Sequence, residues 1–281
     1  MAENPLINVG ELTKPATVLI ERISDAIGLL YAPRHVRRMA AAEADAAKIA
    51  KYAQIDISEI ERRAMERCTL EEGKHQHNME SIIKEALGYV KKDANPEDIE
   101  EDWITSFFSK CRNISNREMQ SLWARVLAGE TNKPGSFSPR TLEFLPSLSK
   151  YDASVFTELC TFCWDLDSFG PTLLVFDDEN EVYMKHRIFL GTLQHLDSIG
   201  LISLRVDDDY YIRIPHREFT VSYFGRSVRL RQRISNKFYV GKCMLTAVGR
   251  ELAPISGAQP SEHYFQWASK RITGRKYYLF F

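Results

Sequence analysis

Long apolar runs are missing from this chain of 281 residues. No stretch approaches the ~18 uninterrupted apolar residues that a transmembrane helix needs. The first residues do not place an apolar run behind a basic start, as a signal peptide does. The chain is 44% hydrophobic and 27% charged, which excludes a disordered protein. We therefore expect a folded cytoplasmic protein with no transmembrane segment and with enough length for two domains.

Cysteine is also scarce, and its pattern excludes a disulfide framework. The cysteines are odd in number and scattered over a long chain. "CTFC" at 160–163 is a single CxxC, whereas a zinc site needs four ligands, and "HQH" at 75–77 lies far away in the sequence. We expect buried thiols, no metal and no cofactor. The five cysteines are Cys68, Cys111, Cys160, Cys163 and Cys243.

Known catalytic motifs are absent as well. The sequence holds no HExxH, GxSxG, Walker or GxGxxG motif, and its seven histidines show no recognised spacing. We assign no catalytic residue and predict a protein that is not an enzyme. A metal-dependent nuclease or another hydrolase is the alternative, because "DDEN" (177–180) and "HREFT" (216–220) hold carboxylates and a histidine. Turn chemistry accounts for "DDEN" equally well.

Helical patterns fill residues 1–150, which we predict to be a bundle-like α-helical interaction domain. Apolar residues recur at helical spacing in its first amphipathic stretch. Ser58 and Ser115 each stand three residues before a glutamate, which is a capping-box pattern. We expect two separate helices between residues 57 and 92, and a later helix that ends at Gly129.

The pattern changes from residue 151 onward. Apolar and polar residues alternate in "LISLRV", "YYIRIP", "FTVSYFG" and "SVRLRQR", as they do in strands, and "TLLVFDDENEVY" predicts strand, turn and strand. A helix over 186–200, then "GLI", then a β-hairpin is the element order of a winged-helix unit. The predicted fold class is α+β, with a mainly α-helical N-terminal region and a small winged-helix-like domain over 151–281.

The near-neutral total charge hides two opposite blocks. Residues 151–216 carry 4 basic and 12 acidic side chains, whereas residues 217–281 carry 12 basic and 3 acidic ones. Asymmetry of this size usually serves electrostatic recognition. Four arginines fall within "RSVRLRQR", and a strand there would place Arg229, Arg231 and Arg233 on one face.

Guanidinium groups spaced ~6–7 Å apart along a strand suit phosphates, because each can form bidentate contacts. Alternatively, the acidic block neutralises the arginines, or the arginines form an ordinary solvated face. The helix over 186–200 has Arg187 as its one fixed cation and carries Asp197, which argues against sequence-specific reading of DNA. The candidate residues for binding phosphate or a partner are Arg226, Arg229, Arg231, Arg233, Lys237 and Lys242.

A second basic cluster, "PRHVRR", directly follows the first amphipathic stretch. An amphipathic helix beside cations can lie on an anionic membrane. Acidic side chains within this helix weaken that case, and apolar stripes at helical spacing are usually core, so packing in a bundle is favoured. The candidate residues for membrane or partner contact are Arg34, Arg37 and Arg38.

A family resemblance is carried by "LWARVLAGE", "PGSFSPRTL" and "LSKYDASVF", in this order between residues 122 and 156. Together with the upstream "GLLYAPRHVRRMAAAEADAAKI", they resemble a bacterial family known only as a domain of unknown function, over roughly residues 10–200. The same order is similar to the Abi-alpha proteins, which are linked by name to abortive infection. That similarity implies a role in anti-phage defence, and the family supplies no catalytic residue.

The leading hypothesis is a non-enzymatic interaction or effector protein in bacterial anti-phage defence. It would act through self-association or through contacts with a protein partner. One alternative is a nucleic-acid-binding regulator that uses the basic β-hairpin. Another is a membrane-acting effector that uses the N-terminal amphipathic helix. Anionic polymers, either nucleic acid or lipid headgroups, are therefore the other expected partners.

Overall fold

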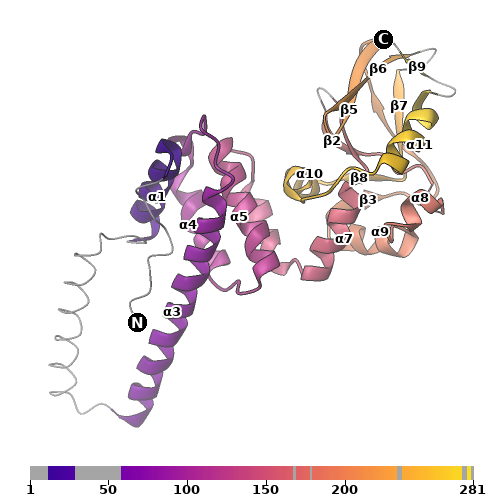
Figure 1. Ribbon diagram of the computed structural model, residues 1–281. Helices are drawn as coiled ribbons and strands as arrows, with labels where there is room; N and C mark the ends of the chain where they lie inside the picture. Colours follow the sequence, from indigo (N-terminus) through magenta and orange to yellow (C-terminus); the bar gives the residue numbers. More distant parts are fainter. Residues whose placement is uncertain are drawn as a thin grey trace. The chain divides into compact units, whose positions relative to one another are not determined.

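The chain divides into two compact units, Met1–Pro146 and Ser147–Phe281 (Figure 1). Helices build the N-terminal unit and sheets appear in the C-terminal unit, which confirms the α+β fold class. Four of the candidate residues, Arg34, Arg37, Arg38 and Arg233, lie outside the described residues. In the computed structural model the described residues are 12–28, 58–166, 169–177, 179–232, 236–273 and 277–279.

The longest helix of the N-terminal unit, α3, runs without a break for 29 residues. It begins with a capping box in which Ser58 and Glu61 exchange hydrogen bonds. The predicted division into two helices is wrong, because the cost of about 1 kcal/mol for Gly73 inside a helix is small for one of this length. The helices are α1 (Lys14–Ile27), α3 (Glu59–Leu87), α4 (Glu101–Cys111), α5 (Arg117–Asn132) and α6 (Pro139–Phe144), with 3-10 turns at Pro96–Asp98 and Leu145–Ser147.

Helix α5 also differs from its predicted limits. Its N-cap is Asn116 instead of Ser115, and the Asn116 side chain accepts hydrogen bonds from the backbone N–H groups of Glu118 and Met119. The helix continues past Gly129 to Asn132. The extra turn buries the residues after Gly129 inside the unit, and this tertiary burial outweighs the local stop signal.

Aromatic rings fill the interior of the N-terminal unit. The ring centroid of Phe107 lies 5.2 Å from that of Trp103 and 5.1 Å from that of Trp123. Leu19 and Ile23 of α1 are fully buried, and α1 packs on α4. The apolar face of the first helix therefore belongs to the core, which favours bundle packing over membrane contact. No helix of the described part of the chain is long and apolar enough to cross a membrane.

One buried carboxylate holds the loop between α5 and α6 in place through hydrogen bonds. Glu130 is 3% exposed and accepts hydrogen bonds from the backbone N–H groups of Gly135 at 2.7 Å and Phe137 at 2.9 Å. Trp103 donates its indole N–H to the carbonyl of Phe137 at 2.8 Å. Gly135 has a φ of +81°, a conformation that favours glycine. The "LAGE" and "PGSF" motifs therefore form a single structural feature.

The C-terminal unit combines short helices with antiparallel sheets. Its largest sheet has the strand order β2-β1-β5-β6-β9, and two smaller sheets pair β3 with β8 and β4 with β7. The helices are α7 (Lys150–Cys160), α8 (Glu181–Met184), α9 (Leu190–Ser198), α10 (Ala247–Leu252) and α11 (Glu262–Thr273). The strands are β1 (Cys163–Leu166), β2 (Gly170–Leu173), β3 (Ile202–Leu204), β4 (Tyr210–Arg213), β5 (Glu218–Tyr223), β6 (Arg226–Gln232), β7 (Lys237–Gly241), β8 (Cys243–Leu245) and β9 (Tyr277–Leu279).

Pairing in the small sheets joins strands that are far apart in the sequence. β3 does not form a hairpin with β4, because β8 and β7 take those places. The end of β7 also approaches the segment after β2 closely. This approach depends on Gly241, whose φ is +100° and at which a Cβ atom would lie 1.9 Å from the carbonyl oxygen of Val175. The winged-helix interpretation stays a prediction.

The predicted second strand within residues 172–183 is wrong, because the chain forms α8 there. The side chain of Asn180 caps this helix by accepting a hydrogen bond from the N–H of Val182. Tyr183 is fully buried and donates its hydroxyl to the carbonyl of Leu174 at 2.9 Å. The buried tyrosine joins α8 to the end of β2, an interaction that local periodicity does not reveal.

Replacing Glu130 with alanine removes the acceptor of two backbone N–H groups. We expect the free energy of unfolding of the N-terminal unit to fall by about 3 kcal/mol, measured by urea denaturation with tryptophan fluorescence. The control is Glu143→Ala, which removes a 72% exposed carboxylate that lies 2.8 Å from Lys110 and should cost less than about 1 kcal/mol. Equal losses in the two variants would contradict the anchoring role of Glu130.

Candidate functional site

The basic strand β6 presents its arginines on both faces. Leu230 is fully buried, whereas Arg229 and Arg231 on either side of it are exposed. Strands β5 and β6 are joined at a tight turn in which Phe224 and Gly225 both have positive φ. The register places Arg231 opposite Glu218, and their side chains form an ion pair at 2.9 Å.

Two of the predicted binding residues, Arg226 and Lys242, lie away from the face of β6 that carries Arg229 and Arg231. Arg226 lies on the opposite face of β6, pairs with Glu262 of α11 at 2.5 Å, and places its guanidinium 5.1 Å from the ring centroid of Phe265. Lys242 lies at the far end of β7, where its backbone N–H donates to the carbonyl of Val175. Arg226 therefore contacts α11, and Lys242 lies at the opposite end of β7 from Lys237.

Further basic residues lie on β4 and β7 and in the short connection between β4 and β5. Only four residues separate Arg213 at the end of β4 from β5, so the Cα atoms of Arg213 and Glu218 are at most about 18 Å apart. The end of β6 is joined to the start of β7, Lys237, by an equally short connection, and Arg213 pairs with Lys237 in the register. The ring centroids of Phe219 and Phe238 lie 5.5 Å apart and hold β5 against β7.

We call these basic residues the cationic patch, and Figure 1 shows the paired strands β6 and β9 of the largest sheet. Sequence periodicity revealed only some of its members, because Arg213 lies on β4 and Arg217 in the connection to β5, outside "RSVRLRQR". The cationic patch consists of Arg213, Arg217, Arg229, Arg231 and Lys237.

The charge of the cationic patch is only partly compensated. Arg213, Arg217 and Arg229 are exposed, and none of them forms an ion pair with a described residue. The carboxylate that pairs with Arg231 is Glu218, which belongs to the basic block itself. The acidic turn 207–209 precedes β4 and therefore lies at the opposite end of that strand from Arg213.

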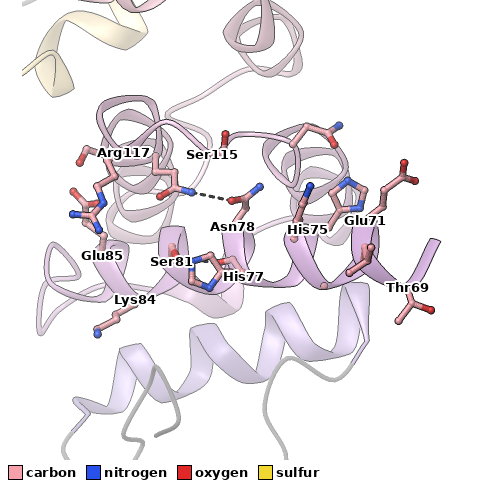
Figure 2. Close-up of a pocket in the computed structure, with 16 residues that line it drawn as sticks. Thr69, Glu71, His75, His77, Asn78, Ser81, Lys84, Glu85, Ser115 and Arg117 are labelled. Atoms are coloured by element: carbon pink, nitrogen blue, oxygen red, sulfur yellow. Dashed lines mark hydrogen bonds between the residues drawn. The ribbon is translucent and has the colours of Figure 1, made fainter. Parts of the chain in front are cut away.

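A separate groove runs along α3 in the N-terminal unit (Figure 2). It has a volume of about 1290 Å³ and is lined by α3 and by the start of α5. Its floor is fixed by Gln120, which donates to the side chain of Asn78 at 3.2 Å, and by Asn78, which donates to the carbonyl of Arg112 at 2.8 Å. Side-chain hydrogen bonds between α3 and α5 therefore hold the floor of the groove in place.

The charges of the groove do not favour ligands of one sign. The cations Lys84 and Arg117 line it together with the carboxylates Glu71 and Glu85. Both histidines of "HQH", His75 and His77, line the groove, and Nδ1 of His75 lies 3.3 Å from the carboxylate of Glu72. The described part of the chain contains no group of three or more side chains arranged to hold a metal ion.

The thiols of the C-terminal unit are packed together without forming a disulfide. The sulfur of Cys160, which hydrogen-bonds the Cys163 thiol, raises the pKa of Cys163, and burial raises it further. Cys243 of β8 is fully buried beside them. A raised pKa keeps a thiol protonated and unreactive, so these cysteines pack as apolar side chains.

The sequence of the chain matches the model of one known protein family. Residues 62–268 match the family described as "Protein of unknown function (DUF2806)". The chain belongs to this family. No curated protein and no solved structure matches the chain. The resemblance to a domain of unknown function is thereby confirmed, and the similarity to the Abi-alpha proteins stays a prediction.

Thiol labelling tests the assignment of these cysteines as packing residues. We expect the exposed Cys68 to react rapidly with a chromogenic disulfide reagent, while the buried Cys111, Cys160 and Cys243 react only on unfolding. A Cys68→Ser variant should lose the rapid phase. Rapid reaction of Cys160 or Cys163 in the folded protein would show an accessible thiolate and contradict the assignment.

Proposed function

We propose that the protein binds the phosphate backbone of nucleic acid through the cationic patch. One observation carries this proposal: Arg213, Arg217 and Arg229 are exposed and form no ion pair with a described residue of the C-terminal unit. Guanidinium groups suit this task because they are always charged and form two parallel hydrogen bonds to a phosphate.

The neighbourhood of Arg229 favours nucleic acid over a lipid surface. In the register Thr220 stands opposite Arg229, and Ser222 stands opposite Ser227 on the same face. A protein that lies on a membrane normally buries apolar side chains beside its cations. A polar face with unpaired arginines instead matches the contacts that proteins make to a nucleic-acid backbone.

Replacing the three unpaired arginines together tests the proposal. The variant Arg213→Ala/Arg217→Ala/Arg229→Ala keeps Arg231 and therefore leaves Glu218 with its partner. The plot of log affinity against log salt has a negative slope. Each lost phosphate contact should reduce the magnitude of this slope by about 0.7 for a single strand. We expect this magnitude to fall by about 2, measured by fluorescence anisotropy with labelled nucleic acid.

A charge-matched control is available in the groove of the N-terminal unit. Lys74→Ala/Lys84→Ala/Arg117→Ala removes the same number of cations from the groove. This variant should bind like the wild type. Absence of wild-type binding at low salt, or a loss of binding confined to the control variant, would reject the cationic patch as the binding surface.

The N-terminal half of α3 favours a second function, self-association. Every residue from 58 to 74 is exposed, and within this stretch Ile60 and Leu70 are 72% and 68% exposed. Figure 1 shows this helical arm projecting beyond α4 and α5. Ion pairs along the arm, such as Arg67 to Glu71 at 2.8 Å, support an isolated helix by a few tenths of a kcal/mol each. The exposed apolar residues are available to a second copy of the chain.

Light scattering over a range of protein concentrations tests self-association. The wild type should show a mass that rises with concentration, and Ile60→Ser/Leu70→Ser should remain monomeric with unchanged helix content by circular dichroism. The control is Tyr89→Ser, which changes a 49% exposed side chain beyond the end of α3. A wild type that is monomeric at every concentration would reject self-association.

A further inference from the structure

The β4–β7 sheet carries two tyrosines and two cations on one face. The register pairs Tyr211 with Tyr239 and Arg213 with Lys237. Residues two apart on a strand share a face, so the four side chains form a two-by-two array. The alternate residues, Ile212 and Phe238, are buried in the core.

The array exposes aromatic surface next to positive charge. Tyr211 is 38% exposed, and its ring centroid lies 5.9 Å from that of Tyr239. The ammonium of Lys237 lies 4.2 Å from the ring centroid of Tyr211. Exposed aromatic rings interleaved with cations on a sheet are the surface on which unpaired bases stack.

We propose that the β4–β7 face binds single-stranded nucleic acid, with a base stacked on Tyr211 and flanking phosphates held by Arg213 and Lys237. This inference rests on the proposed function and names the form of nucleic acid that the cationic patch receives. Bases in a duplex are stacked on one another and cannot reach an aromatic side chain, so the tyrosines select a single strand.

Lys237 occupies one side of the Tyr211 ring in the free protein. A base that stacks on that side must displace the ammonium. An exposed cation–π contact is weaker than the stacking of a base on an aromatic side chain, so the exchange is favourable. The displaced Lys237 stays at the start of β7, where its charge reaches a neighbouring phosphate.

The test compares a labelled single strand of mixed sequence with the same sequence as a duplex, using the full chain and fluorescence anisotropy. The wild type should bind the single strand more tightly. Tyr211→Ala should weaken single-strand binding by about 5- to 150-fold, and Tyr211→Phe should restore it, because phenylalanine keeps the ring face. Tyr151→Ala, which removes a 63% exposed ring on α7, is the matched control.

The outcomes separate this inference from the proposed function. If both nucleic acids bind equally and Tyr211→Ala has no effect, while the triple arginine variant loses binding, the stacking face is overturned and backbone binding stands. If no variant, including the wild type, binds either nucleic acid at low salt, both proposals fail. If Tyr211→Phe is as weak as Tyr211→Ala in folded protein, the tyrosine acts through its hydroxyl and base stacking is rejected.

Discussion

The pairing of β4 with β7 is the constraint on which the C-terminal surface depends. These strands are separated by the whole β5–β6 hairpin, yet their register brings Arg213 against Lys237 and Tyr211 against Tyr239. At the far end of β7, Gly241 leaves room for the carbonyl of Val175 in the segment after β2, because a Cβ atom there would lie 1.9 Å from the carbonyl oxygen. The location of Arg213 and Lys237 beside each other therefore follows from the β4–β7 register.

The N-terminal unit shows how a family signature can be structural. The "LAGE" and "PGSF" motifs place glycine, serine and a carboxylate close together in the sequence. In the structure the Glu130 carboxylate is occupied by the N–H groups of Gly135 and Phe137, and Trp103 holds the same loop. A buried carboxylate with two backbone donors stabilises the loop it belongs to.

Electrostatics distinguishes the two surfaces that could receive a ligand. The groove along α3 mixes carboxylates with cations, so the field it presents has no dominant sign. At the cationic patch Glu218 is the carboxylate paired with Arg231, while Arg213, Arg217 and Arg229 make no ion pair with a described residue. Unpaired exposed cations attract phosphate at modest desolvation cost, which makes this end of the C-terminal unit the stronger candidate.

The sequence by itself determined the local features of this protein. Helical spacing, the capping box at Ser58 and the alternation along "SVRLRQR" are properties of neighbouring residues, and the structure has the helix, the cap and the strand at these positions. It did not determine where α5 ends, because burial of Glu130 outweighs the stop signal of Gly129.

Only the tertiary structure decided which basic residues stand together. Arg226 and Arg229 are three residues apart but lie on opposite faces of β6, and Arg226 is held by Glu262 of α11. Arg213 and Lys237 are far apart in the sequence but are paired across two strands. Periodicity assigns a side chain to a face of its own strand, whereas the neighbours of that face are set by long-range pairing, which no local pattern encodes.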